Sequence, residues 1–588
     1  MSYFDDASLV MIPSGYKTSK VYSVKPTDGT GDLAFTRSND TATRVGPDGL
    51  IEKVRTNRAT YSQLFSNAAW TKGNVTLTAS QADPNGGTSA FLVTDDATND
   101  LHYFYQVVTP QAGEFTFSFY AKANTLTHCG IRLYDGTIYD SAIFNLSNGT
   151  KGSGDGSIES VGNGWYRVSL TKTLTAVGAY FNVLLSNGSS FVYSGSSQSI
   201  YVFGTQYESG VITDYIATTA AVSVGPVANV PRLDYLGSSC PRLLLEPQRS
   251  NLALYSEQFD NAVWTKVQIT TTANSSVSPD GYANADKIAI NNGISGGYAY
   301  QSIATTSSTV YTSSFFIKAA GINFTKFYSN VTGSYVTAVI NLTTGAITNS
   351  GFAVTPTATN YGNGWWRVSY TETSGGGSVP IYVEAGSTSN GGAITGNGTD
   401  GILIWGAQVE AGAYATSYIP TLGAAVTRGV DYPKSASIPS LFGATEGTFL
   451  IEMTFDNKNS NGAIPLFLQS GSNSAYNYAT YIQSGSSSVQ LNVFNNGSQQ
   501  LYLSGGNYTN GQTIKVAVAY KANDLAFYIN GTQIGTGTPV SISSNLSFVQ
   551  LGRYEDAADY FQYNGKISQL LLVKTRLTNA QLAELTTI

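Results

Sequence analysis

Charged and reactive side chains are scarce in this sequence of 588 residues. Only 12% of the residues are charged, and the chain has 2 His, 2 Cys and 3 Met. Catalytic acids, bases and metal ligands come from these residue types, so few are available for chemistry. The two thiols, Cys129 and Cys240, provide no disulfide framework, and we expect both to be buried or half-buried. Stability must therefore come from sheets and hydrophobic packing.

The chain also lacks the charge and hydropathy patterns of nucleic-acid-binding and membrane proteins. Its net charge is −6, and its Lys and Arg residues are scattered, which argues against a nucleic-acid partner. No stretch approaches the roughly 18 apolar residues of a membrane-spanning helix. The N-terminus is acidic at Asp5 and Asp6 and does not resemble a signal peptide. We expect a soluble chain with no membrane insertion and no classical export signal.

Glycine, tyrosine and hairpin signals are abundant. The sequence has 61 Gly, 39 Tyr and thirteen Asn-Gly dipeptides. Asn-Gly favours two-residue hairpins, because both central residues of a type I′ turn need a positive φ. The segments between these dipeptides are rich in Val, Ile, Thr, Tyr and Phe, which favour strands. Together these patterns predict an all-β fold.

One motif occurs twice. Residues 162–169 (GNGWYRVS) return as residues 362–369 (GNGWWRVS), and other matches keep the same order, such as 65–72 with 259–266 and 203–208 with 405–410. Two copies of one fold that differ by small loop insertions produce this pattern. Alternating Phe residues in 114–119 indicate half-buried strands of a two-sheet stack. We predict a tandem duplication of jelly-roll β-sandwiches.

The same patterns divide the chain into six predicted segments. They are an N-terminal arm (1–57), a first sandwich (58–225), an extended linker (226–250), a second sandwich (251–430), a second linker (431–444) and a third sandwich (445–588). The four prolines of the first linker argue against a helix or a central strand there. Residues 578–585 begin with a capping box and predict a short C-terminal helix.

Three groups of residues resemble known families. Residues 519–531, 551–553 and 565–582 resemble the concanavalin A-like, laminin-G-type sandwich that phage and bacterial surface proteins often carry as their last domain. The runs 162–168 and 405–410 look like those of carbohydrate-binding-module-like sandwiches in phage structural proteins. The unrepeated pieces 32–37, 42–44, 49–52 and 230–251 look like a phage virion pattern in which these runs follow each other closely. We therefore hypothesise that the first sandwich is an insertion and that residues 1–57 pack against 226–250.

The repeated aromatic and charged residues are predicted to form the framework of the two copies. The sugar-stacking interpretation of the Trp-Arg strand is weaker, because core aromatics recur in a duplicated fold. Each Arg lies two residues after a Trp, on the same face of the strand, and we expect buried ion pairs with a Glu. The framework residues are Trp70, Trp165, Arg167, Glu208, Trp264, Trp365, Arg367 and Glu410.

Ligand contacts are expected on loops where the copies differ, with exposed Tyr as rigid, wettable contacts. The candidates are Tyr134, Asp135, Tyr139, Tyr328, Tyr335, Tyr476, Tyr478, Tyr481, Arg553, Tyr554 and Asp556. No cofactor is predicted. Paired carboxylates at Asp95-Asp96 or Glu555-Asp556 can hold Ca²⁺, although solvated loops explain them better. His128 and Cys129 point to opposite faces of a strand and are not expected to form a site.

The resemblances imply a phage virion protein, a fibre or decoration protein that binds bacterial surface glycan without catalysis. They imply an N-terminal arm that contacts other virion proteins, and a homo-oligomer, with a trimer favoured. Two alternatives stay open: a polysaccharide-degrading tailspike or glucanase, and a purely structural capsid or tail spacer. The third sandwich has no Glu-x-Asp-x-x-Glu run of the glucanase kind.

Overall fold

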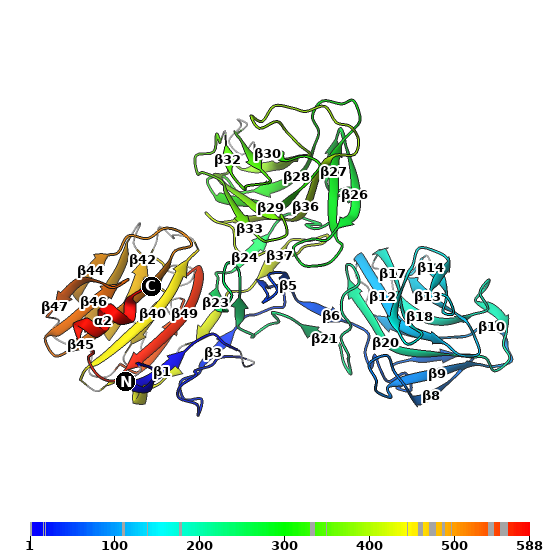
Figure 1. Cartoon of the computed structure of the whole chain (residues 1–588), viewed down its shortest axis with the longest axis horizontal. Helices are drawn as coiled ribbons and strands as arrows, with labels where there is room; N and C mark the ends of the chain where they lie inside the picture. Colours follow the sequence, from blue (N-terminus) through cyan, green and yellow to red (C-terminus); the bar gives the residue numbers. More distant parts are fainter. Residues whose placement is uncertain are drawn as a thin grey trace. The chain divides into compact units, whose positions relative to one another are not determined.

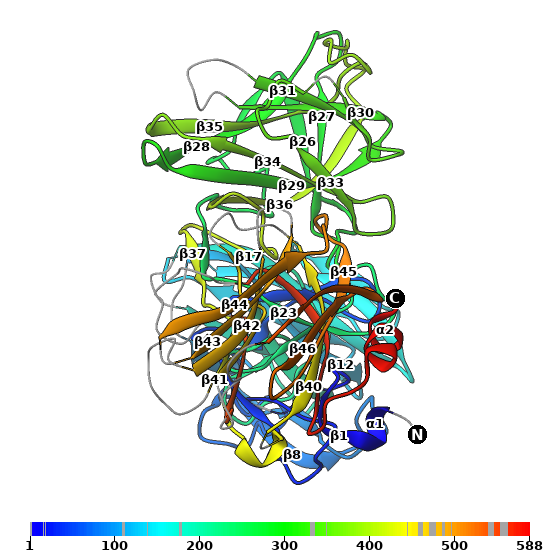
Figure 2. The same ribbon diagram turned by 90° about the vertical axis from the view of Figure 1, so that its left-hand side faces the viewer.

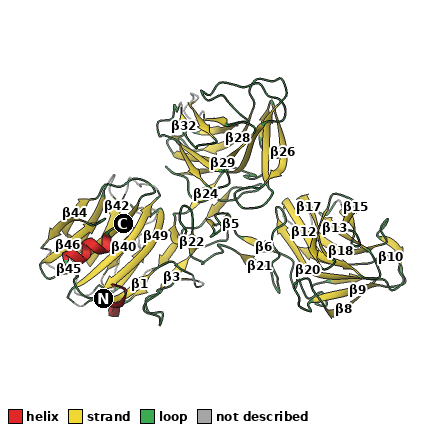
Figure 3. Cartoon of the chain, in the orientation of Figure 1, coloured by secondary structure: helices red, strands yellow, loops and turns green. Residues whose placement is uncertain are grey.

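The structure, a computed structural model, is nearly all β (Figure 3). It describes residues 3–588 apart from 16, 18, 109–111, 138, 176–178, 330–335, 349, 435, 444, 457–461, 470–477, 485–487, 496, 539–545 and 553–562. The helices are α1 (Tyr3–Asp6), α2 (Asn579–Thr586) and a 3-10 turn, η1 (Pro439–Leu441). None of the helices in the described residues is long and apolar enough to cross a membrane. The all-β prediction is confirmed.

The chain forms two compact units, one of which contains the first sandwich. This unit consists of Val54–Gly225 with Tyr282–Asn284. It has two six-stranded antiparallel sheets, and Figure 1 labels β13, β14 and β18 of the first and β12, β17 and β20 of the second. The first sheet runs β15 (Thr150–Ser153), β14 (Tyr139–Asn145), β13 (His128–Tyr134), β18 (Ala179–Ser186), β11 (Tyr103–Val108), β7 (Thr71–Gly73). The second runs β16 (Ser157–Gly162), β17 (Trp165–Thr175), β12 (Ala112–Ala123), β20 (Ser199–Ser209), β9 (Ala90–Asp95), β8 (Val75–Gln81). A small ladder pairs β10 (Asn99–Leu101) with β19 (Val192–Ser194).

The second sandwich repeats this design within the other compact unit, which contains Met1–Lys53, Pro226–Gly281 and Ala285–Ile588. Its first sheet, whose strands β28, β35, β30 and β31 are labelled in Figure 2, runs β25 (Thr265–Val267), β28 (Tyr298–Thr305), β35 (Gly377–Glu384), β30 (Phe324–Ser329), β31 (Val336–Asn341), β32 (Ile347–Thr348). Its second sheet runs β26 (Ile269–Ser276), β27 (Ala285–Ile290), β36 (Gly401–Ala411), β29 (Val310–Ala320), β34 (Trp366–Thr373), β33 (Thr357–Asn360).

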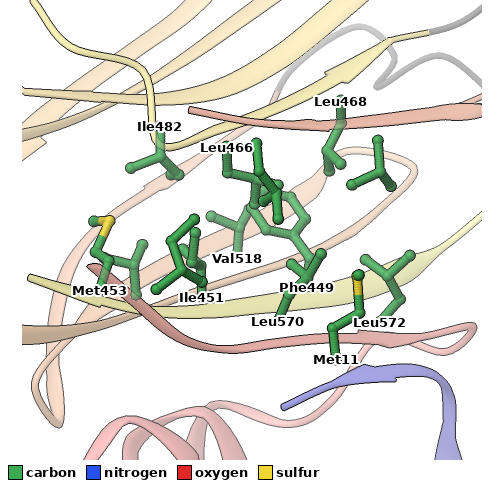
Figure 4. Packing of buried hydrophobic residues seen from close by; sticks show 14 of the residues in the cluster. Met11, Phe449, Ile451, Met453, Leu466, Leu468, Ile482, Val518, Leu570 and Leu572 are labelled. Carbon is green, nitrogen blue, oxygen red and sulfur yellow. The ribbon is translucent and has the colours of Figure 1, made fainter. Parts of the chain in front are cut away.

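The third sandwich uses strands from four parts of the chain. One sheet runs β22 (Arg232–Asp234), β23 (Arg242–Leu245), β49 (Gly565–Val573), β40 (Gly447–Phe455), β45 (Thr513–Lys521), β46 (Asp524–Ile529), β47 (Thr532–Gly537), and β1 (Ala7–Met11) also pairs with β49. The other runs β39 (Ala436–Ser437), β48 (Phe548–Leu551), β41 (Leu466–Gln469), β42 (Tyr478–Ser484), β43 (Val489–Asn495), β44 (Ser498–Gly505). Figure 4 shows Met11 packed with Phe449, Ile451 and Leu570 in the core between them.

The N-terminal segment contributes to both sandwiches of its unit. Besides β1, it forms β2 (Lys20–Val21), which pairs with β3 (Leu33–Thr36), and β3 in turn pairs with β38 (Tyr432–Lys434). It also forms a hairpin of β4 (Thr43–Val45) and β5 (Ile51–Lys53). Val45 and Ile51 of this hairpin pack with Trp365 and Trp405 of the second sandwich. The segment is therefore built into the fold around it.

Residues 1–57 contact residues 226–250 directly. The Arg37 guanidinium donates to the Val230 carbonyl at 3.1 Å, and the Val45 amide donates to Asp234 Oδ2 at 2.9 Å. Leu243 to Leu245 are in register with residues 565–567 of β49. The expectation that prolines exclude an inner strand here was wrong, because Pro241 and Pro247 flank β23 and leave its amides free to pair.

Each repeat begins and ends on a two-stranded ribbon. β6 (Arg55–Asn57) pairs with β21 (Val222–Val224), and β24 (Arg249–Asn251) pairs with β37 (Val426–Arg428). Asn57 donates to the carbonyls of Thr205 and Ile216 at 3.0 and 2.7 Å, as Asn251 does to those of Ala407 and Ile419 at 2.9 and 2.8 Å. Asn57, which the sequence assigned to the arm, therefore plays the same part as Asn251.

The repeated Gly-Asn-Gly motif forms the predicted hairpin. In the first copy it joins β16 to β17, with φ of 52° at Asn163 and 78° at Gly164. In the second copy it joins β33 to β34, with φ of 51° at Asn363 and 81° at Gly364. Asn and Gly tolerate this left-handed region better than other residues. The capping box of the C-terminal helix is also confirmed, with Thr578 and Gln581 exchanging hydrogen bonds.

Candidate functional site

The four repeated tryptophans lie in the cores. Trp70 and Trp264 are 2% and 1% exposed, and Trp165 and Trp365 are 3% and 1% exposed. Trp70 meets Phe65 edge to face, with ring centroids 5.3 Å apart. These indoles have no exposed face on which a sugar could stack, so the structure places them in the framework.

The predicted ion pair between Arg167 and Glu208 is replaced by an indirect link. Arg167 Nη1 donates to the Thr213 carbonyl at 2.7 Å, and the Thr213 amide donates to Glu208 Oε1 at 3.0 Å. The second copy repeats this arrangement with Arg367, Thr416 and Glu410 at 2.6 and 2.8 Å. Among the described residues neither Arg forms a direct ion pair with its Glu, so that prediction was wrong. Burial raises the pKa of the Glu208 carboxyl, which is consistent with hydrogen bonds replacing a charge partner.

The candidate ligand residues of the first copy lie on adjoining strands. Tyr134 ends β13, Tyr139 begins β14, and their rings stack with centroids 4.4 Å apart. Asp135 lies in the turn between them and accepts hydrogen bonds from the Thr137 amide and hydroxyl at 2.9 and 2.7 Å. The expectation that such contacts lie only on loops was therefore wrong for the tyrosines.

The two stacked tyrosines belong to a larger aromatic surface. We call Tyr103, Tyr105, Tyr134, Tyr139 and Tyr180 the first tyrosine face. Its neighbouring ring centroids are 4.4 to 6.1 Å apart, and the hydroxyls of Tyr139 and Tyr180 are 2.5 Å apart. Tyr139 is 51% exposed and the others are half-buried. The alternate residues Phe104 and Phe181 point into the core, so these tyrosines cover the outer side of their sheet.

The second sandwich has a comparable cluster of tyrosines on its own first sheet, the one that contains β28, β30 and β35. We call Tyr298, Tyr300, Tyr328 and Tyr382 the second tyrosine face. Tyr328 and Tyr382 stack at 4.2 Å with an interplanar angle of 13°, and Tyr298 and Tyr300 lie beside Tyr382 at 5.7 and 5.2 Å. Of its members, only Tyr328 was a predicted candidate.

The two faces share one equivalent pair of tyrosines, which is Tyr103 with Tyr105 in the first copy and Tyr298 with Tyr300 in the second. Gln106 pairs with the backbone of Thr60 at 2.8 and 3.0 Å, and Gln301 pairs with that of Leu254 at 2.7 and 2.9 Å. The two tyrosines that precede each Gln at alternate positions are therefore equivalent. Sequence reasoning missed them, although the matched Tyr-x-Tyr-Gln runs at 103–106 and 298–301 carried the signal.

The faces differ in charge. In the second face, Lys326 Nζ is 2.9 Å from Glu384 Oε1 and 5.8 Å from the centre of the Tyr328 ring. In the first face, the guanidinium of Arg132 lies 5.0 Å from the centre of the Tyr139 ring. Burial lowers the pKa of Arg132, and burial together with the hydrogen bond between the Tyr180 and Tyr139 hydroxyls raises the pKa of Tyr180. Each face thus combines tyrosine rings with one cation, and among the described residues only the cation of the second face is paired with a carboxylate.

The third sandwich contributes fewer described candidates. Tyr481 on β42 is 7% exposed and stacks between Phe467 and Phe494, at 5.7 and 6.0 Å. It is a packed aromatic rather than an exposed contact. Tyr478 lies on the same strand, but its side chain is outside the described part of the structure. The remaining candidates, Tyr335, Tyr476, Arg553, Tyr554 and Asp556, also lie outside the described residues.

Of the two carboxylate pairs considered for metal binding, Asp95-Asp96 has structural partners, and Glu555-Asp556 lies outside the described residues. Asp95 accepts from the Tyr193 hydroxyl and the amides of Ser196 and Gln198 at 2.7 to 3.1 Å. Asp96 accepts from the Thr98 amide at 2.9 Å. In the part of the chain that is described, no three His, Cys, Asp or Glu side chains gather as a metal site.

One family model matches part of the chain. Residues 429–583 match the concanavalin A-like lectin/glucanases superfamily, so the third sandwich is a concanavalin A-like domain. The match includes the whole of the predicted linker 431–444, whose strand β39 pairs with β48 of that sandwich. No curated protein matches the sequence.

Solved structures show weak likenesses to the chain. The IT-sialidase CBM40 of Ruminococcus gnavus, bound to alpha2,3 sialyllactose, is 17% identical over 25% of this chain and 84% of its own, with a TM-score of 0.22. Domain 4 of AbnA, a GH43 extracellular arabinanase from Geobacillus stearothermophilus in complex with arabinotriose, is 15% identical over 30% and 82%, with a TM-score of 0.21. The NanB sialidase of Streptococcus pneumoniae is 16% identical over 26% of each chain, with a TM-score of 0.23. Likenesses at this level carry no argument about function.

Proposed function

We propose that the protein is a non-catalytic glycan-binding protein whose two repeats hold carbohydrate on their tyrosine faces. The observation that carries the proposal is that each copy has a cluster of tyrosines on the outer side of its first sheet, and the two sheets correspond to each other. The lectin and glucanase superfamily matched by residues 429–583 supports carbohydrate as the ligand class.

The faces suit sugars physically. Aromatic rings offer an apolar surface to the CH groups of a sugar ring, while the tyrosine hydroxyls bind its hydroxyl groups. Ring contacts of 4.4 to 6.1 Å hold the first face in place before binding, so little side-chain entropy is lost. Two faces on one chain gain further affinity on a repeating polymer through effective concentration.

Alanine substitutions within each face test this proposal. A glycan array would identify ligands, and affinity electrophoresis would compare Tyr105→Ala and Tyr300→Ala with the unaltered protein. We expect each variant to bind about two- to tenfold more weakly, the effect of losing one stacked ring. Tyr502→Ala is the matched control, since this tyrosine is 49% exposed on β44, outside both faces. Unchanged binding in both face variants would contradict the proposal.

Hydrolysis is the alternative that carbohydrate binding itself leaves open. A glycosidase needs two carboxyl groups about 5 to 9.5 Å apart beside the sugar. In the described structure, Glu384 beside the second face is paired with Lys326, and Asp135 beside the first accepts from its own turn. Reducing-sugar release from each bound polysaccharide would distinguish turnover from binding, and we expect none.

The setting of this binding is part of the proposal and rests on the sequence resemblance of residues 32–52 and 230–251 to phage virion proteins. In that setting the protein is a fibre or decoration protein that adheres to bacterial surface glycan, assembled as a homo-oligomer and joined to other virion proteins through its N-terminal part. An antiserum that labels purified phage particles, with light scattering for subunit number, would test it. Binding without any particle association would overturn the virion setting alone.

A further inference from the structure

One cation, Arg132, lies among the rings of the first tyrosine face. It lies on β13, and its guanidinium sits 5.0 Å from the centre of the Tyr139 ring and 5.2 Å from that of Phe191. Among the described residues it forms no ion pair, and its Nε has no hydrogen-bond partner. A half-buried charge held between rings without an opposite charge is costly unless a ligand supplies one.

The neighbouring carboxylates are engaged elsewhere. Asp140, on the adjoining strand β14, pairs with Lys172 at 3.1 Å. Asp135 accepts from the Thr137 amide and hydroxyl within its turn. The charge of Arg132 is therefore not neutralised by the described groups around it.

Polar and spatial features complete the site. Asn182 faces Arg132 across β13 and β18, is 4% exposed, and has an Oδ1 atom with no hydrogen-bond partner in the described structure. Gly130 lies under Phe191, whose ring Cε1 is 2.2 Å from the place where a Cβ would stand. Any side chain at position 130 would displace the ring that lies against the guanidinium.

The second copy lacks this arrangement. The register places Tyr328 opposite Tyr382 where the first copy has Arg132 opposite Asn182. The nearby cation, Lys326, is paired with Glu384 at 2.9 Å. The second face thus carries its own counter-charge, and the first does not.

We propose that the first tyrosine face selects acidic glycans. Arg132 binds the carboxylate of a uronic or nonulosonic acid, and Asn182 Oδ1 accepts a hydrogen bond from a sugar hydroxyl. The planar guanidinium can hold a carboxylate with two parallel hydrogen bonds, and the tyrosines hold the adjoining sugar rings. This inference rests on the proposed function and names the substrate class of one of its two sites.

The test compares an acidic polysaccharide with its uncharged form on the full-length protein. Polygalacturonate, alginate, hyaluronan and polysialic acid would each be titrated calorimetrically beside the carboxyl-reduced polymer. We expect Arg132→Gln to weaken binding to at least one acidic polymer by about ten- to a hundredfold, as for a lost charged hydrogen bond. The affinity of this variant for the carboxyl-reduced polymer should equal that of the unaltered protein. Arg132→Lys should retain part of the preference. Lys521→Gln is the matched control, expected to leave the preference unchanged, because this side chain is 52% exposed on β45, outside both tyrosine faces.

Each outcome decides between the two proposals. Acid selection is overturned if acidic and reduced polymers bind equally, or if Arg132→Gln loses the same affinity for both. Glycan binding itself still stands in that case if Tyr300→Ala weakens it. No binding of any polysaccharide overturns both. Binding of polyglutamate as tight as that of the acidic polysaccharides shows a peptide-binding site and overturns the glycan assignment. Unchanged thermal unfolding of Arg132→Gln excludes misfolding as the cause of a loss.

Discussion

At the scale of single residues, the most consequential group is a buried charge cluster. Arg37 Nη1 lies 2.9 Å from Asp431 Oδ1, Arg232 pairs with Asp431 and Glu246, and Arg428 Nη1 lies 2.9 Å from Glu246 Oε2. The side chains are 0 to 5% exposed. The cluster ties the N-terminal segment, residues 226–250 and the end of the second repeat together.

Asp431→Asn should destabilise the unit that contains this cluster by about 3 to 5 kcal/mol, because it leaves two buried guanidinium groups without their shared carboxylate. Thermal unfolding with calorimetry would measure the loss. Asp155→Asn is the control, since its side chain is 82% exposed beside Lys172, and an exposed pair contributes about 0 to 1 kcal/mol. Equal shifts in the two variants would show that the cluster contributes no more than a surface pair.

The same cluster predicts a loss of stability in acid. Burial alone would raise the pKa of Glu246, but Arg428 and Arg232 outweigh it and hold that pKa well below its usual range. The folded state therefore resists protonation of Glu246. The contribution of this carboxylate to stability is complete above its unfolded-state pKa of about 4.3 and falls as the pH drops below that value. Unfolding measured from pH 7 to pH 3 should show a steeper decline in the unaltered protein than in Glu246→Gln. Parallel declines would contradict this role for Glu246.

At the scale of elements, the hairpin of the repeated motif depends on one glycine. A Cβ at Gly364, where φ is 81°, would meet only Lys318 Cε at 3.5 Å, an ordinary contact. Gly364→Ala should therefore cost about 1 to 2 kcal/mol through backbone strain alone. Gly351→Ala serves as the control, because a Cβ there has 3.8 Å to its nearest neighbour and no positive φ. Denaturant unfolding of the two variants should separate them, and equal stabilities would show that the turn relaxes.

Elements were predictable from sequence where local chemistry decides them, and contacts between elements were not. Asn363-Gly364 specifies its own turn, and Thr578 with Gln581 specifies a helix start. The partner of Arg167 depended on where the Thr213 loop folds back, which residue spacing does not reveal. The tyrosine faces required strand register, since Tyr139 and Tyr180 are distant in sequence but lie on either side of Tyr134 in the sheet, where their hydroxyls meet.

At the scale of the whole molecule, the chain reaches and leaves its first sandwich at one place. Arg55 pairs with Val224 and Asn57 with Val222, so the chain ends of the unit 54–225 are neighbouring strands, about 5 Å apart between Cα atoms. The sequence hypothesis that this sandwich is an insertion rested on the split resemblance alone. The ribbon supplies a physical reason, because adjacent ends allow a domain to be inserted without disturbing its host.

Removing residues 54–225 and joining Lys53 to Pro226 through two or three glycines should therefore leave the other unit folded. The charge cluster, the pairing of β1 with β49 and the core around Phe449 all lie outside the deleted segment, so their free energy of unfolding should be retained. In the full-length protein, the unfolding transition of the unit that contains Asp431 is the one whose midpoint temperature Asp431→Asn should lower. Calorimetry of the deletion variant should show this transition within a few degrees of its temperature in the full-length protein. The isolated segment 54–225 should unfold cooperatively at the temperature of the remaining transition. A deletion variant that loses the Asp431-sensitive transition would show that the first sandwich is required for the fold of its host, and the insertion hypothesis would be abandoned.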